Sequence, residues 1–195
     1  MLLNGNPLLS QTEQQKIKLR AITEQYFKTN TEEKYISQII ENLKNNIGFV
    51  SDTLISKTDT SLFYIRGYST SFNPFSISVN KIEIQFRENK VQIKGEEKPK
   101  DTVLILQIIG ITDSTDENKS RVSEELKRIS KEFISVFPYF YHEKSTKKAK
   151  VPYEFFSFKI FSTPYPSMTI GYGNYYKNQK IHCISLQLYY KLRIE

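Results

Sequence analysis

The sequence has a single cysteine, Cys183, among 195 residues. One cysteine excludes an intramolecular disulfide, and it excludes a zinc site built from cysteine thiolates. Disulfides belong to oxidising compartments, so their absence favours a protein that works in a reducing one. The fold must therefore be held together by a packed core, and a chain of this length is long enough to bury one.

Histidine is almost as scarce, which limits the chemistry that the chain can carry. There are two histidines, His142 and His182, and the second directly precedes Cys183. Neighbouring side chains of a strand point to opposite faces, so this adjacent pair cannot act as thiolate and imidazole. The sequence contains a lone G-x-G at 171–173 but no phosphate loop, serine-hydrolase elbow, zinc-protease motif or kinase signature. We expect a non-enzymatic protein without catalytic residues, cofactor or metal.

Long apolar runs are also missing. No stretch approaches the roughly 20 apolar residues of a membrane span, and residues 1–15 lack the basic and apolar regions of a signal peptide. We expect a soluble cytoplasmic protein without membrane contact. The formal net charge is +7, an excess that permits contact with nucleic acid or with an acidic partner but does not require it.

The most regular pattern in the chain lies at 101–138. Nearly every position of 103–111 is apolar, which predicts a strand that is covered on both faces and is central in its sheet. The following segment has one apolar stripe at helical spacing, made by Val122, Leu126, Ile129, Phe133 and Val136. Between the two, Ser114 and Glu117 match a capping box, and acidic residues suit the positive end of the helix dipole. The acidic cluster Asp113, Asp116 and Glu117 matches no calcium loop, so we interpret it as part of this cap.

Residues 1–50 are predicted to form an arm followed by a helical hairpin. The arm, at 1–9, contains Gly5, Pro7 and four leucines: Leu2, Leu3, Leu8 and Leu9. Such an arm can cover its own core or dock on another copy. A capping box of Ser10 and Glu13 predicts a first helix at about 10–28. Asn30 and Glu33 mark the start of a second helix that ends at Gly48.

Residues 51–195 are predicted to form a sheet domain that packs with the hairpin as one unit. Alternating apolar residues predict strands at 61–68, 75–86, 91–94, 153–161, 168–172 and 181–194, with a turn at 87–90. In the last strand, the even positions of 184–194 are expected to face the core and the odd positions to face solvent. The predicted class is α+β, with a mostly antiparallel sheet of about five to seven strands and one long amphipathic helix packed on it.

Two surfaces are candidates for contact with partners. A loop at 143–150 carries Lys144, Lys147, Lys148 and Lys150 between aromatic clusters, a composition that suits phosphates and stacked bases. The same loop would equally suit an acidic protein, or it is a solvated hairpin tip. Tyrosine occurs thirteen times, more than a core needs, and it suits contact surfaces. A turn predicted at 173–180 holds Tyr175 and Tyr176 beside Tyr172. We assign these three tyrosines, with the four leucines of the arm, to an oligomer interface.

The segments 103–111, 122–137 and 181–194 follow an order of strand, amphipathic helix and last strand. This order resembles the small α+β proteins that complete phage tails and necks, the tail-terminator and tail-completion proteins. The resemblance implies a structural subunit that forms a ring with other copies and with neighbouring structural proteins, located in a virion. The alternative is a nucleic-acid-binding module that uses residues 144–150. A third interpretation is an enzyme with an unmarked carboxylate site.

Overall fold

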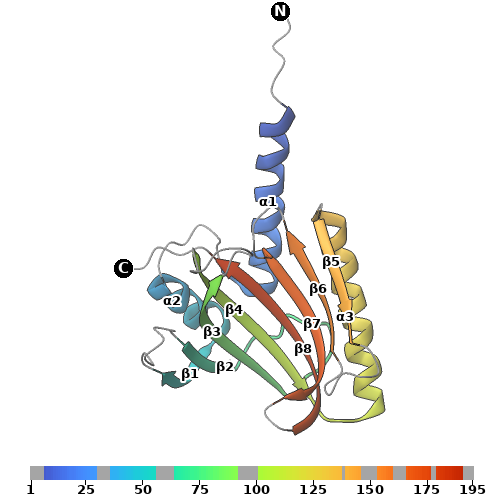
Figure 1. Ribbon diagram of the computed structural model, residues 1–195. Coiled ribbons are helices and arrows are strands. Elements are labelled where there is room, and N and C mark those ends of the chain that lie inside the picture. The colour runs from blue at the N-terminus through green and yellow to red at the C-terminus, as the bar shows by residue number, and fades with distance from the viewer. Residues whose placement is uncertain are drawn as a thin grey trace, which may run out of the picture.

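A computed structural model of the chain describes residues 7–29, 36–55, 64–91, 101–137, 139–145, 153–159, 166–176 and 179–190. In these residues three helices and eight strands follow one another along the chain (Figure 1). The elements are α1 (Pro7–Phe27), α2 (Ile36–Ile47), β1 (Phe49–Ile55), β2 (Tyr64–Ser69), β3 (Lys81–Val91), β4 (Asp101–Thr112), α3 (Asp116–Val136), β5 (Tyr139–Lys144), β6 (Tyr153–Lys159), β7 (Met168–Tyr176) and β8 (Gln179–Tyr190).

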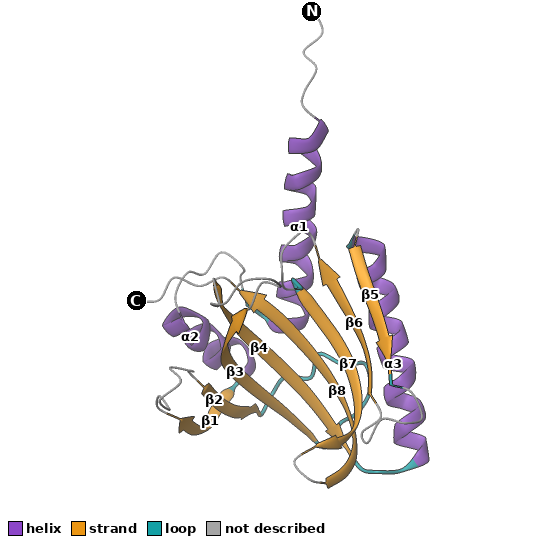
Figure 2. Cartoon of the chain, viewed as in Figure 1, coloured by secondary structure: helices purple, strands orange, loops and turns teal. Residues whose placement is uncertain are grey.

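The strands form one antiparallel sheet in the order β1-β2-β3-β4-β8-β7-β6-β5. The sheet consists of two meanders of four strands each, which α3 connects and which meet where β4 pairs with β8 (Figure 2). The α+β class and the antiparallel pairing are as predicted. The sheet is larger than expected, because β1 and β5 were not recognised in the sequence.

Strand β4 lies near the middle of the sheet, between β3 and β8, and is buried on both faces as predicted. Leu104, Leu106 and Ile108 belong to the core under the helices, whereas the alternate residues Ile105 and Ile109 are buried on the opposite face. The apolar stripe of α3 is buried on the sheet, also as predicted. One hydrophobic cluster contains residues of all three helices and of both meanders, so the helices and the sheet share a core.

The N-cap of α3 is Thr115, and the prediction of Ser114 was wrong by one residue. Thr115 has extended backbone angles, its side chain accepts a hydrogen bond from the amide of Asn118 at 3.2 Å, and its carbonyl accepts from the amide of Lys119 at 3.0 Å. A residue with extended angles whose carbonyl already accepts the first helical bond is the N-cap. Asp116 and Glu117 lie in the first turn, where the helix dipole favours them.

Helix α1 begins at Pro7, three residues before the predicted capping box of Ser10 and Glu13. Proline suits the first turn of a helix because its missing N–H has no partner there in any case. Leu8 and Leu9 are therefore helical and not part of an arm, while Leu2 and Leu3 lie outside the described residues. Helix α1 has 21 residues, as many as α3.

Only the last turns of α1 pack on the rest of the chain, and its first turns project beyond the sheet (Figure 1). The ring of Tyr26 meets the ring of Phe133 in α3 edge to face, with centroids 5.3 Å apart. Its hydroxyl donates to Glu132 Oε2 at 2.5 Å, and burial together with hydrogen bonding to this carboxylate raises the pKa of Tyr26. Helix α1 is thus anchored on α3 near its C-terminal end.

Helix α2 buries one face, made by Ile39, Leu43 and Ile47, and ends at Gly48 as predicted. Gly48 has a φ of +61°, and a Cβ there would lie 2.7 Å from Thr70 Oγ1, so the position requires glycine. Asn46 Nδ2 donates to the carbonyl of Lys28 at 3.2 Å, which joins the end of α2 to the end of α1. A packed helical hairpin stays a prediction, and its predicted start signal at Asn30 lies outside the described residues.

Residues 70–80 form a loop, although 75–80 were predicted to continue a strand. The side chain of Asn73 accepts from the amide of Phe75 at 3.0 Å and donates to the carbonyl of Ile77 at 2.8 Å, which closes a tight turn. Phe75 is buried, and Ile77 and Val79 pack against the core. Their alternation reflects burial of one side of a loop and not a strand ladder.

Two predicted turns lie within strands. Residues 87–90 belong to β3, which pairs with β4 as far as Val91 and Asp101. The return strand predicted at 91–94 lies, apart from Val91, outside the described residues. Residues 173–176 belong to β7, which pairs with β8 as far as Tyr176 and Gln179, with a register shift between Gly173 and Tyr175.

Candidate functional site

The two faces of the sheet differ in chemistry because the helices cover only one of them (Figure 1). The helix-covered face carries rows of large apolar side chains. On the opposite face, one row of cross-strand partners is polar from β2 to β5: Arg66, Gln85, Gln107, Gln187, Thr169, Ser157 and Tyr141. We call this side of the sheet, which carries none of the described helices, the open face, although Val103, Ile105 and Ile109 of β4 are buried on it.

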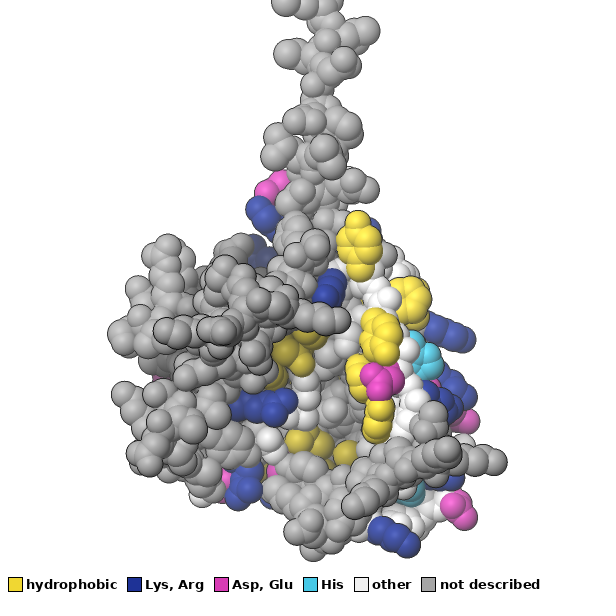
Figure 3. Space-filling model, in the orientation of Figure 1, with side chains coloured by type: hydrophobic (Ala, Val, Ile, Leu, Met, Phe, Trp, Pro, Cys, Tyr) yellow, Lys and Arg dark blue, Asp and Glu magenta, His cyan; other side chains and the backbone are white. Residues whose placement is uncertain are grey.

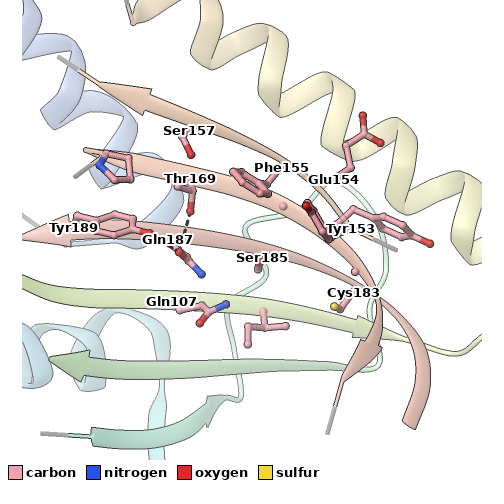
Figure 4. A pocket seen from close by; sticks show the side chains of 15 residues that line it. Gln107, Tyr153, Glu154, Phe155, Ser157, Thr169, Cys183, Ser185, Gln187 and Tyr189 are labelled. Carbon is pink, nitrogen blue, oxygen red and sulfur yellow. Dashed lines mark hydrogen bonds between the residues drawn. The ribbon is translucent and has the colours of Figure 1, made fainter. Parts of the chain in front are cut away.

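A hollow of about 500 Å³ lies on the open face (Figures 3 and 4). Its volume falls within the about 300–1,000 Å³ that is usual for small-molecule sites. The floor comes from β4, β8 and β7, and one wall comes from β6. Most of its side chains are neutral: Gln107, Ile109, Tyr153, Phe155, Ser157, Thr169, Cys183, Ser185, Gln187 and Tyr189.

Two glycines of β7 create part of this space. A Cβ added to Gly171 would lie 3.4 Å from Phe155 Cβ and 3.5 Å from Ser185 Oγ, which are ordinary contact distances. A Cβ added to Gly173 would lie 3.3 Å from Cys183 Sγ. A Cβ at Gly171 would therefore occupy part of this space at ordinary contact distances.

The polar groups of the hollow are held in place but are not saturated. Gln187 Oε1 accepts hydrogen bonds from Thr169 Oγ1 at 3.0 Å and from the hydroxyl of Tyr189 at 2.8 Å (Figure 4). These two donors fix the orientation of the amide and leave its Nε2 free to donate. Among the described residues, the side chains of Gln107, Ser157 and Ser185 have no protein hydrogen-bond partner.

The described residues that line the hollow turn no formal charge into it. Glu154 is the one carboxylate among them, and its side chain points away toward the helix-covered side (Figure 4). There Glu154 accepts from His142 Nε2 at 3.1 Å and lies 3.5 Å from Lys144 Nζ. The hydroxyl of Tyr153, a lining residue, donates to the carboxylate of Glu143, as does the hydroxyl of Tyr141.

Cysteine and histidine do not meet in this structure. The thiol of Cys183 lies at the hollow, and burial raises its pKa to about 11, so it is protonated at neutral pH. His182 lies on the other face, where its Nδ1 is 2.9 Å from the hydroxyl of Tyr172, and burial lowers its pKa. His142 stacks on Phe156 with centroids 4.0 Å apart. The described residues include no group of three or more His, Cys, Asp or Glu side chains that could hold a metal ion.

A second candidate surface is the outermost strand β5, whose first three residues are exposed aromatics. Tyr139 is 63% exposed, Phe140 50% and Tyr141 59%. We call these three residues the aromatic edge. In the part of the chain that the structure describes, β5 pairs with β6 only. The opposite edge, β1, differs because a register shift between Ser51 and Thr53 bends it.

The residues assigned to partner contact from the sequence do not form one surface. Lys144 is the last residue of β5, is exposed and pairs with Glu154, while Lys147, Lys148 and Lys150 lie outside the described residues. Tyr172 is half-buried in β7 against the core, which does not suit an interface residue. The turn predicted from residue 173 begins later, because β7 extends to Tyr176, and Tyr175 and Tyr176 pair with Lys180 and Gln179 near the end of the hairpin.

Sequence reasoning did not identify the hollow, and it recognised the aromatic cluster at 139–141 beside the lysine loop but not as part of an outermost strand. One signal for the hollow was present, because Gln107 is the single polar residue in the otherwise apolar stretch 103–111. A polar residue at such a position needs a polar surrounding or a ligand. The other residues of the hollow are brought together by strand register, which no local pattern encodes.

Comparison with protein-family models, with curated proteins and with solved structures found no match to this chain. None of the described helices is long and apolar enough to cross a membrane. A function for this chain is therefore argued from its own residues.

Proposed function

We propose that the chain is a non-enzymatic assembly subunit that docks on another subunit through β5. The observation that carries this proposal is the aromatic edge, three consecutive exposed aromatic residues on the outermost strand of the sheet. The resemblance to phage tail-terminator and tail-completion proteins agrees with it, because such subunits join through strands and loops at their edges. In this proposal the partner strand belongs to another copy or to a neighbouring structural protein.

Strand addition at β5 would use both the backbone and the side chains. An outermost strand offers unpaired N–H and C=O groups that a partner strand can bind. Single exposed apolar residues are common on protein surfaces and carry no meaning alone. Three in succession on such a strand supply apolar contact at the place where the backbone is open, and aromatic residues are enriched at interfaces.

The aromatic edge is also partly ordered before any partner binds. The ring of Phe140 lies 6.5 Å from that of Phe158, and the ring of Tyr141 lies 6.4 Å from that of Phe155. Glu143 accepts a hydrogen bond from the hydroxyl of Tyr141. Rings held in place lose less conformational entropy on association, which favours binding.

The test is the native mass of the protein at several concentrations, for the parent and for two variants. Tyr139→Lys places a charge on the edge, a substitution that discourages strand pairing. Ile134→Lys is the matched control, because Ile134 is an exposed apolar residue of α3. We expect the parent and the control to assemble and the Tyr139→Lys variant to stay monomeric. A parent that remains monomeric at high concentration, or a Tyr139→Lys variant that assembles as the parent does, would overturn the proposal.

The nucleic-acid alternative is a second proposal, and one observation favours it. Lys144 is exposed at the end of β5, in the same strand as the aromatic edge. Its pairing with Glu154 neutralises part of its charge, which makes this proposal the weaker one. Replacing Lys144, Lys147, Lys148 and Lys150 by Ser should reduce the salt dependence of binding by about one unit of slope for each phosphate that is no longer neutralised. An unchanged slope would remove nucleic acid as a ligand of 144–150.

A further inference from the structure

We propose that the hollow on the open face binds a neutral saccharide unit. This inference is independent of the proposed assembly function, because the hollow and the aromatic edge present different groups. Three properties of the described residues around the hollow support this assignment: their unsatisfied polar groups, the absence of a formal charge turned into the hollow, and the aromatic rings of β6. Figure 4 shows the strands from which these groups come.

The polar groups define the first requirement for the ligand. Gln107 offers both an amide oxygen and an amide nitrogen, Ser157 and Ser185 offer hydroxyls, and none of the three has a protein partner among the described residues. Gln187 adds a nitrogen donor of fixed direction, because its oxygen already accepts from Thr169 and Tyr189. A ligand that buries these groups must both donate and accept along adjacent strands, since an apolar ligand would leave them unsatisfied. Sugar hydroxyls do both.

The charge of the hollow defines the second requirement. No lysine or arginine is among the described residues that line the hollow, and the carboxylate of Glu154 is turned away from it and paired. A phosphate or carboxylate buried against these residues would lose hydration without gaining a counter-charge from them, which is costly. The carboxylate of Glu143, which accepts from Tyr153 of the lining, already accepts from two tyrosine hydroxyls and is a poor partner for a cation. The described lining therefore favours a neutral ligand.

The aromatic wall defines the third requirement. The rings of Tyr153 and Phe155, two residues apart on β6, have centroids 5.8 Å apart and planes inclined by 26°, so they stack on each other at the wall of the hollow. Aromatic faces carry negative potential and attract the weakly positive C–H groups of a sugar ring. The hydrogen bond from the hydroxyl of Tyr153 to Glu143 holds its ring in this position. Polar groups on the floor and a ring face on the wall match the hydroxyl edge and the C–H face of one sugar.

Binding is tested by calorimetric titration of the full chain with three neutral trisaccharides: maltotriose, cellotriose and N,N′,N″-triacetylchitotriose. Glucose 6-phosphate, uridine and a short oligonucleotide serve as comparison ligands. We expect saturable binding of at least one neutral trisaccharide and weaker binding of every comparison ligand. Absence of binding to all three trisaccharides overturns the proposal. Tighter binding of the phosphorylated sugar, the nucleoside or the oligonucleotide overturns the assignment to a neutral saccharide.

Two variants locate the binding. Gln107→Leu removes polar groups that have no protein partner among the described residues, so the fold should tolerate it, and affinity should fall about five- to tenfold. Gly171→Val fills the hollow and should abolish binding. Gln38→Leu is the control for the first variant, because Gln38 is exposed on α2, and its affinity should equal that of the parent. If Gly171→Val does not fold, the affinity of the Gln107→Leu variant alone tests the proposal. Affinity unchanged in Gln107→Leu would overturn the proposal.

Discussion

Breaking the ion pair between Glu125 and Arg128 should cost different amounts depending on which partner is removed. Glu125 is a buried carboxylate of α3, and Arg128 lies one turn further along the same helix. The guanidinium donates from Nε to Glu125 Oε2 at 2.8 Å and from Nη2 to Oε1 at 2.7 Å. These bonds to Glu125 raise the pKa of Arg128 above its ordinary value. The amide of Ser76 also donates to Oε1, at 2.8 Å, so the pair holds the 70–80 loop on the helix.

The two substitutions should cost different amounts because the two side chains differ in solvent exposure. The side chain of Glu125 is 3% exposed and that of Arg128 is 43% exposed. When Arg128 is replaced by Met, the buried carboxylate keeps the Ser76 amide as its one partner among the described residues, and stability should fall by about 3 kcal/mol, the low end for a broken buried pair. When Glu125 is replaced by Gln, the half-exposed arginine keeps its contact with Glu132, 3.6 Å from Nη1, and the new amide oxygen still accepts one bond. That change should cost about 1 kcal/mol.

Urea unfolding of the parent and the two variants, followed by circular dichroism, measures both values. Equal m-values are required, so that a shift of the midpoint reports stability. The double variant with Glu125→Leu and Arg128→Met should be more stable than Arg128→Met alone, because the stranded carboxylate is gone. If Arg128→Met lowers the unfolding free energy no more than Glu125→Gln does, the buried carboxylate does not depend on its charged partner, and the reasoning fails.

Three further predictions concern single positions on the sheet. Gly171→Ala should raise the unfolding free energy by about 0.5–1 kcal/mol, because its Cβ meets only ordinary contacts. Gly110→Ala should lower the unfolding free energy by about 1–3 kcal/mol, because its Cβ would lie 2.7 Å from a ring carbon of Phe75. Thermal melts of the two variants measure both effects, and equal shifts of the melting temperature would contradict the packing at Gly110. Burial lowers the pKa of His182 in the folded chain. Its contribution to the free energy of unfolding is therefore fully present above a pH of about 6.5, and it is lost as the pH falls through the lower pKa of the folded state. Urea midpoints should therefore fall less between pH 7.5 and 5.5 in His182→Gln than in the parent, and parallel profiles would refute this. The pKa of Cys183 is raised from 9.0 to about 11, so a disulfide reagent at pH 8 should react about 100-fold more slowly with the folded chain than with the unfolded one, and similar rates would count against burial.

The sequence predicted those elements whose burial follows a regular period. Strand β4 and helix α3 were identified because one is apolar on both faces and the other has a complete stripe. Strand β5 was missed because its residues are exposed on both faces and show no alternation. The loop at Phe75 alternates like a strand because its side chains cover the core, although its backbone turns at Asn73.

The candidate sites depend on register and could not be read from any local pattern. Gln107, Gln187 and Thr169 are adjacent because β8 lies between β4 and β7. Nothing near these residues in sequence specifies that neighbourhood. The turn expected around Tyr175 illustrates the same limit, because Gly and Asn favour a turn locally while pairing with β8 extends the strand.

The position of β8 has a consequence for how the chain acquires its structure. Each meander can form from neighbours in sequence, but the pairing of β4 with β8 joins residues as distant as Leu104 and Tyr190. Contacts of this range slow folding, because a long loop must close before they form. Since β8 is synthesised after every other strand, the apolar edge of β4 stays without its partner throughout translation of the second meander. An unpaired apolar strand in a nascent chain is prone to aggregation and is a natural target for chaperones. Chaperone dependence during synthesis should therefore concentrate on β4, while the isolated first meander should be the fragment most prone to self-associate.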